Sequence, residues 1–84
     1  MNNKYIISVE ADDMQDAIST ELGSNVEEDL AQEVLDNFID TTEVTAESGC
    51  SAEEECLSMM LALMKQIGEH KTQIIQYINE AEVA

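Results

Sequence analysis

Hydrophobic residues recur at helical spacing in three segments of the chain. In the first segment Ala17 and Ile18 follow Met14 by three and four positions, and Leu22 follows Ile18 by four, which places all of them on one side of an α-helix. The same spacing continues through residues 25–40 and through residues 52–81. We therefore predict a mainly α-helical fold with three principal helices, near 12–22, 25–40 and 52–81.

The N-terminal segment has a different pattern. Tyr5, Ile7 and Val9 alternate with a half-polar set of residues, and this period of two predicts a short β-strand. The half-polar set is Ile6, Ser8 and Glu10. A single strand needs a pairing partner. The alternative to the mainly helical fold is therefore an α+β domain in which residues 4–9 and 41–46 form a two-stranded ribbon.

A pair of residues typical of a capping box marks the start of each predicted helix. In this arrangement a polar side chain before the helix and another three residues later satisfy backbone amides of the first turn. The pairs are Asp12 with Gln15, Ser24 with Glu27, and Ser51 with Glu54.

Length and charge restrict the possible functions. The 84 residues suffice for one domain, which we assign to residues 1–84. With 44% hydrophobic residues the chain should fold, although 19 acidic residues against 3 lysines give a net charge of -16. Sixteen of the acids lie between Tyr5 and Met64, where there is no lysine or arginine. This charge argues against direct binding to nucleic acid and favours a basic partner.

Several acids should form rows on helix surfaces. At about 100° per residue, four acids of segment 25–40 fall in one narrow sector opposite the apolar side: Asp29, Glu33, Asp36 and Asp40. Like charges at such spacing cost about 0.2–0.5 kcal/mol per pair, so the sequence forgoes stability there. A solvated surface or salt adaptation is the alternative interpretation. The predicted partner-binding residues are Asp29, Glu33, Asp36 and Asp40, with Asp12, Asp13 and Asp16 in the first helix and Glu53, Glu54 and Glu55 at the start of the third.

In size, in its lack of arginine and in the acids from Glu10 to Glu55, the chain resembles the small acidic inhibitors, often phage-encoded, that block restriction or CRISPR nucleases by imitating nucleic acid. The resemblance covers about two thirds of the chain and includes no shared motif. It implies a non-enzymatic inhibitor whose carboxylates imitate phosphates and occupy the basic groove of a nucleic-acid-binding protein or nuclease complex.

The apolar positions of the third helix suggest self-association. Residues at 3-4 spacing form a seam like that of a coiled coil, which predicts a homodimer. Gly68 is a point where this helix could bend or divide. The alternative function is a small acidic chaperone or antitoxin that binds its partner through an apolar helix face. The predicted seam consists of Leu57, Met60, Met64, Ile67, Ile74 and Ile78.

The remaining chemistry is sparse. Cys50, Cys56 and His70 match no zinc-binding spacing, and fourteen residues of one straight helix would hold Cys56 about 21 Å from His70. We therefore expect no catalytic residue, no metal and no cofactor. The sequence shows no signal-peptide pattern and no apolar run long enough for a membrane span, so we expect a cytoplasmic protein without a membrane partner.

Overall fold

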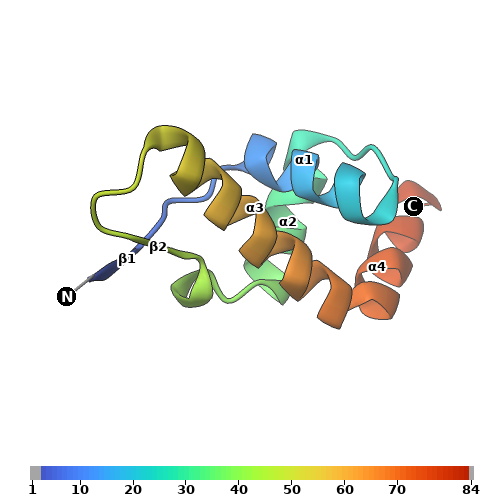
Figure 1. Cartoon of the computed structure of the whole chain (residues 1–84). Helices are drawn as coiled ribbons and strands as arrows, with labels where there is room; N and C mark the ends of the chain where they lie inside the picture. The colour runs from blue at the N-terminus through green and yellow to red at the C-terminus, as the bar shows by residue number, and fades with distance from the viewer. Residues whose placement is uncertain (1–2, 84) are drawn as a thin grey trace.

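The computed structural model describes the backbone of residues 3–83 and the side chains of residues 3–82. The molecule is elongated, with principal extents of 48 × 18 × 17 Å, and its first strand and last helix lie at opposite ends of it (Figure 1). In chain order the elements are β1 (Lys4–Ile6), α1 (Ala11–Leu22), α2 (Glu28–Phe38), the 3-10 helix η1 (Thr41–Glu43), β2 (Thr45–Glu47), α3 (Ala52–Glu69) and α4 (Lys71–Val83). The fold is therefore mainly α-helical, as predicted, and it also contains the small ribbon.

The ribbon pairs the two ends of the first half of the chain. β1 and β2 are antiparallel, with Tyr5 opposite Ala46. Ala46 is buried, whereas Tyr5 is partly exposed, so one side of the pair contributes to the core. The ribbon continues into the loop before α1, where the Ile7 amide donates to the Val44 carbonyl at 2.8 Å. The predicted strand at 4–9 is thus shorter, and its partner lies at 45–47 rather than 41–46.

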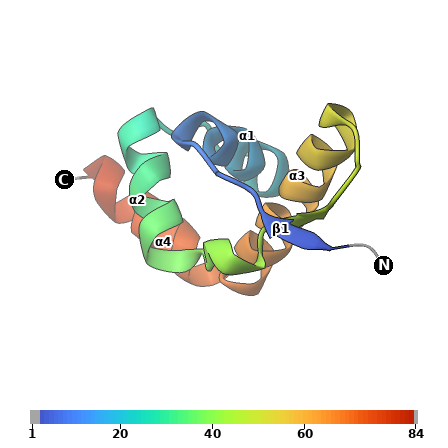
Figure 2. The same ribbon diagram turned by 90° about the vertical axis from the view of Figure 1, so that its left-hand side faces the viewer.

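Each helix buries the side that its hydrophobic spacing predicts. Helix α1 packs against both α2 and α3, and α2 also contacts α4. Figure 2 shows α2 and α4 together on one side of α1, with α3 on the other. The largest fully buried side chains come from α1, α2, α3, α4 and the segment before β2: Met14, Ile18, Val34, Val44, Leu63, Ile67 and Ile74.

The third predicted helix is two helices. The backbone leaves the helical conformation at His70, with φ -114° and ψ 23°, two residues after Gly68. Helix α4 then turns away from the axis of α3, as Figure 1 shows, and buries Ile74 and Ile78 in the same core as α3. A straight helix over 52–81 would carry these two isoleucines away from α2, so burial favours the break.

Two of the predicted capping boxes are wrong. Helix α1 is preceded by Glu10, and the Asp13 carboxylate accepts a hydrogen bond from the Glu10 amide at 3.0 Å. Helix α2 starts after Glu27 rather than after Ser24. Gln15, which we assigned to the first capping box, instead donates to the Val26 carbonyl at 2.9 Å and fastens the loop between α1 and α2.

The capping box of α3 is confirmed. The Glu54 amide donates to Ser51 Oγ at 3.2 Å, and the Ser51 amide donates to Glu54 Oε1 at 3.3 Å.

Gly23 ends helix α1 with φ +71°, a left-handed conformation that strains any residue with a side chain.

Candidate protein interface

Three of the predicted acids form a row on α2. Asp29, Glu33 and Asp36 are all exposed, while Val34 and Leu35 on the opposite side of the helix are buried. With a rise of about 1.5 Å per residue, successive carboxylates are spaced about 6 and 4.5 Å along the helix axis. The apolar side fixes the rotation of α2 on the core, so the row is held facing solvent.

Asp40 does not belong to this row. Helix α2 ends at Phe38, and Ile39 adopts an extended conformation that buries its side chain. Asp40 precedes η1, where its carboxylate accepts hydrogen bonds from the amide and hydroxyl of Thr42. Its backbone is clamped by the buried Gln66, whose Oε1 accepts from the Asp40 amide at 2.8 Å and whose Nε2 donates to the Asp40 carbonyl at 3.0 Å. Asp40 therefore joins α2 to α3, and the prediction of four acids on one helix is wrong at this residue.

Glu33 is positioned by an aromatic pair. The Tyr77 hydroxyl on α4 donates to Glu33 Oε1 at 3.0 Å. The Tyr77 ring makes an edge-to-face contact with Phe38, with ring centres 5.6 Å apart. The hydrogen bond to the negatively charged Glu33 raises the pKa of Tyr77 above its usual value. One carboxylate of the row is thus held at a fixed place by a residue 44 positions away.

The acids of α1 lie at and after its first turn. Asp12 and Asp16 are exposed, and Asp13 is half-buried. Carboxylate oxygens of Glu10, Asp12 and Asp13 lie within 4.8 Å of one another. Their position at a helix N-terminus, where backbone amides favour negative charge, accounts for this cluster.

The predicted partner-binding acids of α3 also lie in its first turn. Glu53 and Glu54 are exposed, while Glu55 is half-buried. Glu55 accepts a hydrogen bond from the Tyr5 hydroxyl, which links α3 to the ribbon. This bond raises the pKa of Tyr5 well above its usual value of 10.0, with a smaller contribution from Cys50.

The negative charge of these ten acids is not neutralised by hydrogen bonds from cations. Within residues 3–82, every hydrogen bond that they accept comes from a neutral donor: a backbone amide, a hydroxyl or, for Asp36, the Gln32 amide group at 3.0 Å. The three lysines lie elsewhere, with Lys4 in β1, Lys65 near the end of α3 and Lys71 at the start of α4. The acidic surface of α1 and α2 is therefore not compensated by hydrogen bonds from these lysines.

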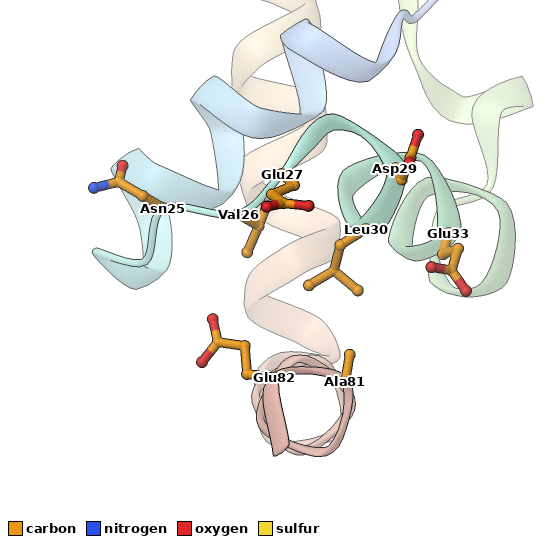
Figure 3. A pocket seen from close by; sticks show the side chains of 8 residues that line it. All are labelled: Asn25, Val26, Glu27, Asp29, Leu30, Glu33, Ala81 and Glu82. Carbon is orange, nitrogen blue, oxygen red and sulfur yellow. The ribbon is translucent and has the colours of Figure 1, made fainter. Parts of the chain in front are cut away.

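A groove opens between the start of α2 and the end of α4. Its volume is about 480 Å³. Figure 3 shows that Val26 and Leu30 point toward α4, where Ala81 faces them. Carboxylates surround this apolar floor, although that of Asp29 points away from α4 in the same view. The lining residues are Asn25, Val26, Glu27, Asp29, Leu30, Glu33, Ala81 and Glu82.

Sequence reasoning found Asp29 and Glu33 but missed the rest of the groove. The signal was incomplete because residues 52–81 were predicted as one helix, which gave no reason to bring Ala81 and Glu82 to α2. The alternation of Val26 and Leu30 with acids was visible, but it fits the core of an ordinary helix equally well.

The six predicted seam residues do not form one exposed surface. Ile67, Ile74 and Ile78 are buried in the core of the chain itself. Met60 and Met64 are half-buried against that core, and only Leu57 is largely exposed. The break at His70 also interrupts the seam. The three isoleucines therefore contribute to the chain's own core rather than to an exposed seam, and the homodimer stays a prediction.

Cys50, Cys56 and His70 differ in their exposure and contacts. Cys50 is half-buried beside Tyr5, Cys56 is exposed, and both are free thiols. His70 contacts Gln73 through Nδ1 at 3.2 Å.

Comparison with known proteins returned no match to any family model, curated protein or solved structure. Among the helices of the described residues, none has both the length and the apolar character needed to cross a membrane.

Proposed function

We propose that this chain is a non-enzymatic inhibitor that binds a basic, nucleic-acid-handling protein by presenting carboxylates in place of phosphates. The observation that supports this proposal best is the combination of exposure and unneutralised charge in the acids of α1 and α2. Salt bridges to the chain's own lysines would have removed the attraction, and no lysine donates to these acids among residues 3–82.

The dimensions also suit a nucleic-acid groove. The longest extent, 48 Å, corresponds to about 14 base pairs at about 3.4 Å each. The carboxylates of α2 follow one another at about 4.5–6 Å, which is the same order as the phosphate repeat along one strand. A positively charged groove attracts such a surface over long range and speeds its encounter with the inhibitor.

The test compares two variants with the same net charge. The double variant Asp16→Lys, Asp36→Lys reverses exposed acids of α1 and α2 that lie outside the groove. The matched control Glu69→Lys, Glu80→Lys makes the same charge change at exposed positions of α3 and α4. Each protein is immobilised and incubated with a nuclease-treated bacterial lysate at low and at high salt.

We expect the wild type and the control to capture a basic protein that high salt or excess oligonucleotide releases. The double variant should lose this protein. Equal capture by both variants, or retention in saturating oligonucleotide, would contradict phosphate mimicry.

The alternative is an acidic chaperone or antitoxin that docks an apolar segment of its partner. The supporting observation is the exposure of Leu57 and Leu61, which leave 60% and 58% of their surfaces in solvent one helical turn apart on α3. For this function, Leu57→Gln with Leu61→Gln should abolish capture, and high salt should leave it intact.

A further inference from the structure

The groove between α2 and α4 combines an apolar floor with a negatively charged rim. Val26, Leu30 and Ala81 form the floor, and Figure 3 shows the carboxylates of Glu33 and Glu82 on opposite sides of it. A surface that is merely solvated needs no hollow of about 480 Å³ with apolar side chains at its base.

We propose that this groove binds an arginine side chain, with an apolar neighbour, from a basic segment of the partner protein. The inference rests on the proposed function and specifies the segment that anchors the complex. An arginine has a hydrocarbon stem that can cover Leu30 and Val26 and a planar guanidinium that can reach carboxylates at the rim. The guanidinium is more weakly hydrated than the lysine ammonium, so it loses less on entering a groove with an apolar floor.

The rim is organised before a ligand arrives. The Tyr77 hydroxyl holds Glu33 Oε1 at 3.0 Å, and the edge-to-face contact with Phe38 holds Tyr77. Because Glu33 is already oriented, binding costs less side-chain entropy than it would for a freely rotating glutamate. None of the three lysines lines the groove, so no cation of the described chain occupies the place of the guanidinium.

The volume accommodates more than one side chain. Grooves of about 300–1,000 Å³ bind ligands of several functional groups. We therefore expect a short segment in which arginine alternates or pairs with leucine, with the leucine on the floor and the arginine at the rim. A row of phosphate-like carboxylates alone would accept arginine and lysine similarly, and this difference makes the groove testable by itself.

The probe is an acetylated, amidated peptide, Ala-Leu-Arg-Arg-Leu-Ala, with its lysine and glutamate analogues. Binding is measured by amide and methyl NMR titration of the full chain at low ionic strength. The variants are Glu82→Gln at the rim and Leu30→Gln on the floor. The matched control is Glu80→Gln, which removes one exposed carboxylate from the same helix outside the groove. Circular dichroism verifies that each variant is folded.

We expect saturable shifts centred on Val26, Leu30 and Ala81, weaker binding of the lysine peptide and none of the glutamate peptide. Glu82→Gln should weaken binding about fivefold and Leu30→Gln about tenfold, whereas Glu80→Gln should change it by less than about twofold. Shifts spread over all the acidic helices, equal loss in Glu80→Gln, equal binding of both basic peptides, or no binding would overturn the proposal.

The outcome is separable from that of the proposed function. The substitutions at Glu80 and Glu82 leave the acids of α1 and α2 unchanged. The peptide test of the groove can therefore give a negative result while Asp16→Lys, Asp36→Lys still abolishes capture of the partner. Conversely, selective peptide binding with unchanged partner capture in that double variant would leave the groove in place and remove phosphate mimicry.

Discussion

Asp36 occupies a position where a negative charge weakens the fold. It lies in the last turn of α2, which contains no basic residue, and it lies three positions after Glu33. The carbonyl end of a helix disfavours negative charge and favours positive charge. The substitution Asp36→Lys should therefore make the protein more stable while it weakens binding to a basic partner.

The size of the effect follows from three contributions. Replacing an unfavourable charge by a favourable one at the helix end contributes about 0.6–2 kcal/mol, twice the effect of a single charge. Repulsion from Glu33 becomes attraction, which contributes about 0.4–1 kcal/mol. Loss of the hydrogen bond from Gln32, 3.0 Å long, costs about 0.2–0.5 kcal/mol. The net stabilisation is about 0.5–3 kcal/mol.

Urea unfolding followed by circular dichroism measures this change. With an m-value of about 1–1.5 kcal/mol/M, the midpoint should rise by about 1 M at low ionic strength. The gain should shrink in high salt because these charges are exposed. Asp36→Asn, which removes the charge without reversing it, should fall between the wild type and Asp36→Lys. A midpoint that is unchanged or lower in Asp36→Lys would refute the view that this acid is kept at the expense of stability.

Three other predictions test the account of the fold. Gln66→Met should lower the free energy of unfolding by about 1–3 kcal/mol, because it removes both hydrogen bonds to the Asp40 backbone. The exposed control Gln76→Met should change it by less than about 0.5 kcal/mol in the same urea assay. Gly23→Ala should lower the thermal unfolding midpoint because the backbone at this position is left-handed, with φ +71°. Gly68→Ala should raise the midpoint, because alanine favours the helix more than glycine does and the new Cβ would meet only the movable Glu21 side chain at 3.4 Å. In an ultraviolet titration Tyr77 should ionise above pH 10, and Glu33→Gln should return its pKa toward that value. Because the pKa is raised in the folded state, the stability from this hydrogen bond is present below pH 10 and is lost as the pH rises through the pKa of the folded state. An unshifted pKa of Tyr77 would contradict the contact.

The parts of the fold that depend on local spacing were predictable from the sequence. The periodic apolar residues of α1 and α2 gave both helices to within a few residues, and the Ser51 capping box marked the start of α3. These features depend on interactions within one or two turns, which the sequence displays directly.

The parts that depend on tertiary packing were not predictable. Gly68 marks a point where the predicted helix could bend or divide, but the spacing of apolar residues continues unbroken through His70. Nothing local therefore indicates that α4 turns back toward α2. The break is favoured because Ile74 and Ile78 then join the core formed by the other helices. Asp40 is not part of the acidic row for a related reason. Burial of Ile39 ends α2 at Phe38, so Asp40 lies beyond the helix.

The candidate site was predictable in its acids but not in its shape. Exposure of Asp29, Glu33 and Asp36 follows from their place opposite the apolar side of one helix. The contact between Tyr77 and Glu33, and the groove beside it, join segments more than 40 residues apart. Only the three-dimensional arrangement shows which carboxylate is held in place and which lies over an apolar floor.

The most direct measurement of phosphate mimicry is displacement from DNA. A bacterial lysate is loaded on DNA-cellulose at low salt, and the bound proteins are eluted with this chain, with Asp16→Lys, Asp36→Lys, or with Glu69→Lys, Glu80→Lys. We predict that the wild type and the Glu69, Glu80 control release the same basic protein that free DNA releases, and that the Asp16, Asp36 variant does not. If the wild type releases nothing beyond what buffer of equal ionic strength releases, or if both variants act alike, the carboxylates do not stand in for phosphates.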